Sequence, residues 1–387
     1  MQSRLGYLPA LDGVRGVAVL LVVCNHSPDP FSRSGATLLP GGFVGVDIFF
    51  VLSGFLITTL LMQEFAQTGS ICFKQFYARR ARRLGPALIL MLATLCCFGF
   101  AAFKPPLAYK NFVGCLIALF YCTNWVTVSP LSGFNFGTVA HTWTLSIEGQ
   151  FYAIWPVIFL ALLKMINGAR QMIMALVIIV LCLWADSVML TLNGASAARI
   201  GCGLDSRIHT LMVGCFLGVA LAAMNVTGQQ RLHKFLSVAA PISLASLVIF
   251  SMLGNGINQR LYHGGFVAID LLAAIFVADS VVAAGSMLRG FLEMKWLVWV
   301  GAISYGIYIW HWPILVILMY FYRCPAWSVL LFGVPLSFLV AVVSYYRIEE
   351  PIRQGRISWS LLKLKWRALW SAVTVGPKHW RGRRGMH

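Results

Sequence analysis

The sequence predicts an all-α fold, a polytopic membrane helix bundle of about ten transmembrane helices, from three observations. Of its 387 residues, 59% are hydrophobic and only 11% are charged, with a mean hydropathy of +0.80, which exceeds what one soluble core could bury. Apolar runs of about 20 residues recur, the length that crosses roughly 30 Å of hydrocarbon as a helix. The alternating pattern of membrane-spanning β-strands is absent from the sequence.

The apolar runs indicate ten spans, near residues 8–27, 41–63, 85–103, 143–163, 171–190, 207–224, 237–253, 264–284, 297–320 and 327–346. The loop "FYARRARRLGP" and the Lys- and Arg-rich tail after Pro351 are expected on the cytoplasmic side by the positive-inside rule. An even number of spans then places both termini in the cytoplasm. The first run lacks a small-residue cleavage site, so we expect it to be retained.

Residues 111–128 are apolar enough to cross, but counting them as a span would place several cationic loops outside. These are the loops with Lys164, Arg170, Arg231, Lys234, Arg289 and Lys295. We therefore predict one re-entrant or in-plane segment there, packed against other helices. The predicted organisation is a transmembrane domain of residues 1–353 and a basic cytoplasmic tail of residues 354–387, with no appended soluble domain.

The net charge of +18 lies mainly in short loops and in the tail, which favours cytoplasmic anchoring over nucleic-acid binding. The ten cysteines mostly lie inside apolar runs and lack metal-ligand spacing, so they are interpreted as packing residues. The sequence therefore predicts no metal site.

Arg15 and His26 lie at the two ends of the first span, "DGVRGVAVLLVVCNHS". Their separation of eleven residues returns them to nearly the same helix face, about 16 Å apart along the axis. A structural interpretation is that Arg15 snorkels to the interface and His26 hydrogen-bonds a neighbouring helix. Ionisable groups inside a span are costly, so a functional interpretation is the default.

Further intramembrane polar residues are expected near the depth of His26. The predicted topology places Asp47, Glu148 and His311 at roughly its level in the outer half of the membrane, with His141 close by. An imidazole oriented by a carboxylate is a good general base for a hydroxyl group. We therefore predict His26, Asp47 and Glu148 as catalytic residues, and His141 and His311 as acceptor-side candidates.

Arginines are expected to gather below this level, on the cytoplasmic side. They are Arg15, Arg79, Arg80, Arg82 and Arg83. Such a group suits a phosphorylated, soluble donor, although topological anchoring alone is the alternative. On the outer side, Asp205 and Arg207 flank the sixth span, where they could pair or contact a polar acceptor, and Arg207 is a further acceptor-side candidate.

Six stretches of the chain resemble, in order, the motifs of the membrane acyltransferase-3 family. They are "LDGVRGVAVLLVVCNH", "GGFVGVDIFFVLSGFLIT", "FYARRARRLGPAL", "HTWTLSIEGQFYAIWP", "ISYGIYIWHWPI" and "IEEPIR", from about Leu8 to Arg353. The resemblance implies that Arg15 and His26 are an essential pair and that the 79–83 arginines serve the donor. In one departure, the family's Glu-Glu-Gln reads Glu148, Gly149, Gln150 here, so we keep Glu148 as the functional carboxylate.

The resemblance implies a membrane-embedded acyltransferase in a bacterial-type inner (cytoplasmic) membrane. It would move an acyl group from cytoplasmic acyl-CoA to a hydroxyl of a saccharide or glycoconjugate, and acetyl is the acyl group expected first. The identity of the acceptor stays open. Candidates are O-antigen, exopolysaccharide, a peptidoglycan or glucan sugar, a lipid-linked saccharide and a small glycosylated metabolite. An acyl-His26 intermediate, the oligomeric state and the acyl group also stay open. The alternatives are a proton-coupled transporter using the intramembrane His, Asp and Glu side chains, disfavoured by the lack of paired halves, and a non-catalytic scaffold.

Overall fold

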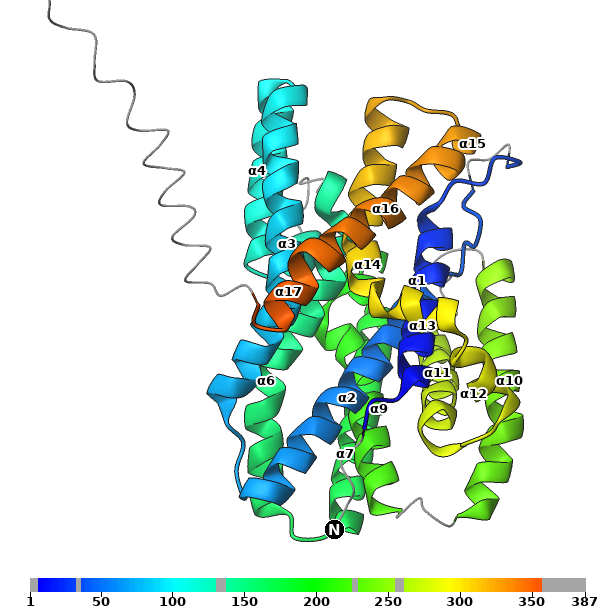
Figure 1. Cartoon of the computed structure of the whole chain (residues 1–387). Helices are drawn as coiled ribbons and strands as arrows, with labels where there is room; N and C mark the ends of the chain where they lie inside the picture. Colours follow the sequence, from blue (N-terminus) through cyan, green and yellow to red (C-terminus); the bar gives the residue numbers. More distant parts are fainter. Residues whose placement is uncertain (1–5, 33–35, 130–136, 225–228, 255–260, 357–387) are drawn as a thin grey trace, which may run out of the picture.

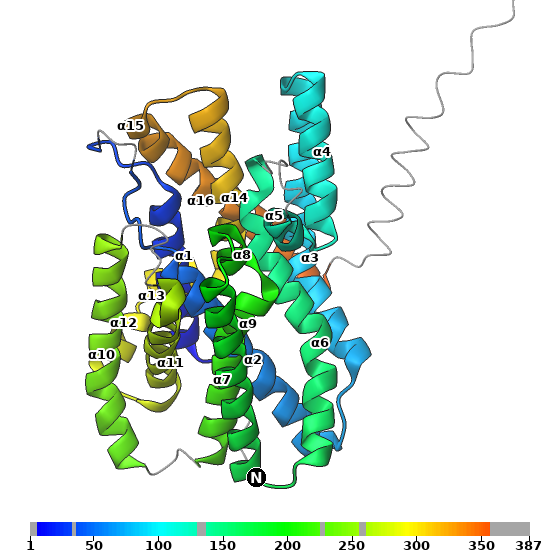
Figure 2. The same ribbon diagram turned by 180° about the vertical axis from the view of Figure 1, so that it is seen from behind.

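The computed structural model describes residues 6–32, 36–129, 137–224, 229–254 and 261–356. Over these ranges the chain is a bundle of helices, and the only β contact is an isolated bridge between Pro28 and Thr37 (Figures 1 and 2). The predicted all-α class is confirmed. Most of the predicted basic tail, from residue 357 onward, lies outside the described residues.

The longer helices are α1 (Pro9–His26), α2 (Val44–Thr68), α3 (Phe73–Ala102), α4 (Pro105–Leu119), α6 (Trp143–Met165), α7 (Ala169–Leu192), α9 (Leu204–Ala223), α10 (Gln230–Leu253), α11 (Phe266–Val282), α14 (Ser304–Val316) and α16 (Val334–Ser344). The shorter ones are α5 (Thr123–Val128), α8 (Ala197–Cys202), α12 (Met287–Leu292), α13 (Lys295–Ala302), α15 (Ala326–Ser328) and α17 (Glu350–Arg353). A 3-10 helix, η1 (Gly137–Thr142), leads into α6, and the π-helical turns are η2 (Leu261–Gly265), η3 (Ile317–Phe321), η4 (Val329–Gly333) and η5 (Tyr345–Glu349).

Within the described ranges, eight helical stretches are long and apolar enough to cross a membrane. They are Val44–Thr68, Phe73–Ala102, Gly137–Met165, Ala169–Leu192, Ala197–Ala223, Gln230–Leu253, Ser304–Phe321 and Ala326–Arg353. Each overlaps one predicted span. The other two predicted spans are also helical, as α1 with 18 residues and α11 with 17. The chain is therefore a multi-pass membrane protein.

The predicted span 297–320 is divided in the structure. α13 ends at Ala302, Ile303 leaves the helical conformation with φ −97° and ψ 6°, and α14 begins at Ser304. α13 instead lies against the N-terminal half of α1, where Gly301 meets the backbone of Asp12 and leaves no room for a Cβ. This close approach fixes the part of α1 that carries Arg15.

Residues 111–128 do not form one continuous span. α4 has 15 residues, about 22 Å of helix, and the chain turns at Tyr121, which has a left-handed φ of 56°. α4 runs beside α3 in both views, and α5 follows after the turn (Figures 1 and 2). Two short helices joined by a turn suit the predicted re-entrant or in-plane segment better than a crossing.

α2 is the central helix of the bundle. It packs on α9, α1, α11 and α6, and 78% of its apolar window is buried, compared with 11% for α7. Gly54 of α2 and Gly214 of α9 each face the partner helix's backbone, so the two helices approach closely. α2 thus has two buried faces, one toward α3 and α6 and the other toward α9 and α11.

Candidate active site

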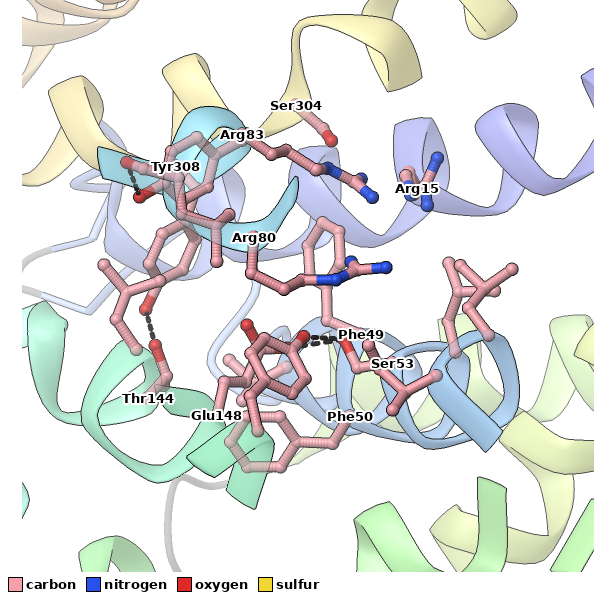
Figure 3. A pocket seen from close by; sticks show the side chains of 18 residues that line it. Arg15, Phe49, Phe50, Ser53, Arg80, Arg83, Thr144, Glu148, Ser304 and Tyr308 are labelled. Carbon is pink, nitrogen blue, oxygen red and sulfur yellow. Dashed lines mark hydrogen bonds between the residues drawn. The ribbon is translucent and has the colours of Figure 1, made fainter. Parts of the chain in front are cut away.

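A cavity lies between α1, α2, α3, α6 and α14. Its wall is largely apolar but carries three arginines, Arg15, Arg80 and Arg83, and the carboxylate Glu148. In Figure 3 the three guanidinium groups gather on one side of the cavity, and Glu148 lies beside Ser53. The cavity therefore joins residues from the first five of the six sequence motifs, whose helices meet around α2. The sixth motif contributes Arg353 to a neighbouring space instead.

Glu148 is held by a short chain of hydrogen bonds. The Ser53 hydroxyl donates to Glu148 Oε1 at 2.6 Å, and the Tyr152 hydroxyl donates to Ser53 Oγ at 3.0 Å. Ser53 comes from α2, whereas Tyr152 is one turn further along α6 than Glu148. These bonds orient the carboxylate toward the cavity and fix α6 against α2.

The four arginines of α3 divide between two helix faces. Arg80 and Arg83 are partly buried and line the cavity, whereas Arg79 and Arg82 are exposed. A spacing of three residues places each pair on one face. Arg79 is paired with Glu64 at 3.1 Å. The arginines that the sequence predicts as one donor-binding group therefore form an inner pair, Arg80 and Arg83, and an outer pair, Arg79 and Arg82.

The outer pair lines a second space, here called the vestibule. Six arginines line it, and Asp12 is the one acidic residue among the described residues in its wall. The six are Arg15, Arg79, Arg80, Arg82, Arg83 and Arg353. Arg15, Leu56, Arg80 and Arg83 border both spaces, so the vestibule leads into the cavity through a basic neck.

The positive charge of the neck is only partly neutralised. Arg15 pairs with Asp12 at 2.5 Å, but within the described residues neither Arg80 nor Arg83 forms an ion pair. Arg80 lies 5.8 Å from the ring centroids of Phe76 and Tyr152, and its buried Nε has no hydrogen-bond partner. Uncompensated guanidinium groups beside open space suit a phosphorylated or otherwise anionic ligand.

His26 and His311 form a direct pair at the other end of α1. The distance from His26 Nδ1 to His311 Nε2 is 2.9 Å, and His311 Nδ1 lies 3.1 Å from the Ile307 carbonyl oxygen. A carbonyl only accepts, so His311 Nδ1 carries the proton, and the neutral ring must accept at Nε2. His26 then donates from Nδ1, which leaves the lone pair of His26 Nε2 available as a base.

His141 and Tyr308 lie between the histidine pair and the cavity. The ring centroids of His141 and His311 are 5.8 Å apart, and His141 Nε2 donates to the Ile309 carbonyl at 3.1 Å. The Tyr308 hydroxyl, which lines the cavity, donates to the His141 carbonyl at 2.8 Å and lies 2.5 Å from Thr144 Oγ1. Figure 3 shows the Tyr308–Thr144 contact at the cavity edge.

Asp47 does not join this centre. It forms a buried ion pair with Arg207, whose guanidinium lies 4.0 Å from the ring centroid of Phe266. Asp205 pairs instead with Arg199, so the anticipated Asp205–Arg207 pair does not form. His209 Nδ1 is 2.8 Å from Asp270 Oδ2, which gives this side of α2 two buried acid–base pairs.

The prediction that four intramembrane residues lie at one depth is therefore wrong in part. These residues are His26, Asp47, Glu148 and His311. His26 and His311 meet, but Glu148 is seven residues beyond His141, about 10 Å along the helix, in the arginine cavity. Position within each predicted span implies a similar depth for these residues, but η1 extends the helical segment before the start of α6. The catalytic roles of Asp47 and Glu148 stay predictions, and Asp47 and Glu148 are not neighbours of the His26 ring in the contacts given above.

The departure at Gly149 and the neighbouring Gln150 both contact the turn at Tyr121. A Cβ at position 149 would lie 2.8 Å from Tyr121 Cε1. Gln150 Nε2 donates to the Tyr121 carbonyl at 2.7 Å, and Gln150 Oε1 accepts from Trp125 Nε1 at 3.1 Å. Glu148 thus faces the cavity, whereas the next two residues hold the turn between α4 and α5.

Sequence reasoning missed four side chains of the site. Ser53, Tyr152 and Tyr308 line the cavity, and Arg353 lines the vestibule. The signal for Ser53 is helical spacing, because Val46, Phe49, Phe50, Ser53, Leu56 and Ile57 line the cavity at intervals of three and four residues. Arg353 closes the last quoted motif, but only the fold brings it to the vestibule.

The site offers no metal-binding group: in the part of the chain that the structure describes, no three His, Cys, Asp or Glu side chains are grouped to hold an ion. The titratable side chains that it does gather are the arginines of the neck, the carboxylate of Glu148 and the histidines beyond Tyr308. Together they place cationic groups at one end and an imidazole nitrogen with a free lone pair at the other.

Comparison with known proteins gives one family match. The model of the family described as "Acyltransferase domain" matches residues 8–346. Peptidoglycan O-acetyltransferase OatA of Listeria monocytogenes is 32% identical over 360 residues, which cover 90% of this chain and 56% of that protein. O-acetyltransferase OatA of Staphylococcus aureus strain NCTC 8325 is 32% identical over 357 residues, 90% of this chain and 57% of that protein.

A third similar protein is the putative peptidoglycan O-acetyltransferase YrhL of Bacillus subtilis strain 168. It is 32% identical over 365 residues, covering 92% of this chain and 56% of that protein. The chain thus spans somewhat more than half the length of these curated relatives. No solved structure matches it.

Proposed function

The chain belongs to the acyltransferase domain family, and we propose that it is a membrane O-acetyltransferase using cytoplasmic acetyl-CoA as donor and a hydroxyl of a cell-wall saccharide as acceptor. The printed names of the similar proteins support the acetyl group and a peptidoglycan-type acceptor. The membrane is the bacterial-type inner (cytoplasmic) membrane, with the vestibule facing the cytoplasm.

The observation that carries this proposal is the continuous basic path from the vestibule into the cavity. CoA is phosphorylated at one end and reactive at the other, so it needs a cationic mouth and a narrower, largely apolar chamber. The vestibule and neck supply the first, and the wall formed by α2, α6 and α14 supplies the second. The phosphates would bind the arginines by charge-assisted hydrogen bonds, and the pantetheine arm would follow α1 toward His26.

The histidine pair suits the transfer step. Arg15 and His26 are about 16 Å apart along α1, a span that an extended pantetheine arm can bridge once the Tyr308–Thr144 hydrogen bond opens. His26 Nε2 takes the proton of the acceptor hydroxyl as its oxygen attacks the thioester carbonyl. The C–S bond breaks, the new C–O ester forms, and the CoA sulfur receives the proton from His26.

His311 positions His26 during this step. By accepting the His26 Nδ1–H, it selects the tautomer with a free Nε2 and supports the imidazolium formed after proton uptake. The Ile307 carbonyl in turn fixes the His311 tautomer. This relay uses side chains of α1 and α14 alone, which agrees with Glu148 and Asp47 lying elsewhere.

The test is thioester consumption by the purified protein in nanodiscs, with acetyl-CoA and soluble peptidoglycan fragments. His26→Ala should lower product formation by about 100-fold or more, with normal protein yield and melting temperature. His233→Ala is the matched control, because His233 lies on α10 outside the cavity and bonds the Ala284 carbonyl. Near-normal product from His26→Ala would remove His26 from the mechanism.

Two further results separate the alternatives. Proton flux in liposomes without any thioester consumption would support a transporter instead. Mass spectrometry of surface glycans from cells with and without the gene identifies the acceptor, and unchanged acetylation of every cell-wall glycan would contradict the proposed acceptor class.

A further inference from the structure

The vestibule carries more positive charge than the diphosphate of CoA requires. Arg15, Arg80 and Arg83 at the neck already provide three guanidinium groups at the mouth of the cavity. Arg79, Arg82 and Arg353 line only the vestibule. A second anionic group, held further from the cavity than the first, would use them.

Arg353 is placed for such a contact by its own neighbours. It ends α17, which packs beside α3, and its Nη2 pairs with Glu350 at 2.5 Å. Its side chain is 54% exposed, and a guanidinium has five N–H donors. One edge of the group is therefore held by Glu350, while other donors stay accessible from the vestibule.

An aromatic side chain accompanies these arginines. Tyr7 lines the vestibule and is 72% exposed. An exposed ring beside several arginines can stack on a purine while the guanidinium groups hold phosphates. A bare phosphate or a lipid head group would use the charges but not the ring, so the combination favours a nucleotide.

We propose that the vestibule binds the 3′-phosphorylated adenosine half of the donor and that Arg353 contacts the 3′-phosphate. This inference rests on the proposed function, because it assumes a CoA donor, and it adds a specificity determinant. Arg353 distinguishes CoA from donors that share the phosphopantetheine arm but lack the 3′-phosphate, and Tyr7 stacks on the adenine. The neck arginines hold the diphosphate in both cases.

The experiment measures equilibrium binding of CoA and of 3′-dephospho-CoA to the full chain in phosphatidylcholine nanodiscs, which needs no acceptor. The unaltered protein should bind CoA about fivefold to tenfold more tightly than 3′-dephospho-CoA. Arg353→Gln should weaken CoA binding by the same factor and leave 3′-dephospho-CoA binding unchanged. Tyr7→Ala should weaken both ligands equally.

Arg356→Gln is the matched control, since Arg356 is an exposed arginine three residues away that does not line the vestibule. It should leave both affinities unchanged, and an equal effect of Arg356→Gln and Arg353→Gln would reduce the result to general electrostatics and overturn the assignment. Equal binding of CoA and 3′-dephospho-CoA by the unaltered protein would also overturn it. Failure to bind either ligand, together with binding of an acyl carrier protein, would instead refute the CoA donor of the proposed function.

Discussion

Charged side chains lie along both buried faces of α2, but the two faces differ in whether those charges have ion-pair partners among the described residues. On the face toward α3 and α6, Arg80 and Arg83 border open space without an ion-pair partner among the described residues. On the face toward α9 and α11, Asp47 pairs with Arg207 inside the packed bundle, and both are almost fully buried.

The difference separates a binding site from a structural contact. A buried cation without a counter-charge is costly, and the fold retains it where a ligand supplies the missing charge. A buried cation that is already paired with a carboxylate has its charge neutralised and attracts an anionic ligand only weakly. Position within the predicted spans could not make this distinction, since Asp47 and Glu148 are both acidic residues in apolar helices.

The largest effect is expected from a substitution that breaks the buried ion pair of Asp47 and Arg207. Arg207→Leu leaves the Asp47 carboxylate buried and unpaired, and should lower the free energy of unfolding by about 3 to 5 kcal/mol. Removing both charges, with Asp47→Leu added, should recover much of that loss. Thermal unfolding in detergent, monitored by size-exclusion chromatography, measures the stability of the single and the double variant. A double variant as unstable as the single one would contradict a structural ion pair.

The next largest effect is expected at the histidine pair, where His311 sets the tautomer of His26. His311→Leu removes the acceptor for His26 Nδ1–H and should reduce acetyl transfer by about 100-fold. His311→Gln can still accept through its amide oxygen and should retain more activity than the leucine variant. Rates at saturating acetyl-CoA measure the two variants, and equal rates would show that the hydrogen bond to His26 is not used.

A smaller effect distinguishes the inner from the outer arginines of α3. Lysine keeps the charge but loses the planar, two-pronged contact with phosphate. Arg80→Lys or Arg83→Lys should therefore weaken CoA binding by about 1 to 3 kcal/mol, roughly fivefold to 150-fold.

The matched substitutions are Arg79→Lys and Arg82→Lys on the exposed face, for which a change of less than about 1 kcal/mol is expected. Melting temperatures should stay at the unaltered value for all four variants. Equal losses at inner and outer positions would mean that the cavity lining does not decide which arginine holds the diphosphate.

The smallest effect concerns the hydrogen-bond chain to Glu148. Tyr152→Phe removes the hydroxyl that donates to Ser53, a change expected to cost about 1 kcal/mol. If the chain only orients Glu148 in the cavity, CoA affinity should fall by about fivefold with little change in stability. A loss of stability without loss of affinity would assign the chain to packing between α2 and α6.

The sequence alone determined the class of fold and the family. Hydropathy settles which segments are helical in a membrane, because a span must satisfy its backbone hydrogen bonds internally and must be long enough to cross. Six ordered motifs were sufficient for the family. The same reasoning also anticipated that residues 111–128 differ from the other apolar runs, since their charge neighbours conflict with a crossing.

The sequence also identified Arg15, His26 and the 79–83 arginines as unusual, because a charged residue in an apolar helix needs a reason to be there. It could not decide which of them share a space. Helix spacing separates the two faces of α3, but which face lines a cavity depends on the helix packed against it.

Only the tertiary structure decided the partners of the intramembrane charges. Asp47 and Arg207 are 160 positions apart, and His26 and His311 are 285 apart, so nothing local to either residue specifies the contact. The close approach of α2 to α9 and of α1 to α13 sets those distances through glycines that admit another backbone. Side-chain pairing across a helix bundle depends on rotation and depth of each helix, which are properties of the packed whole.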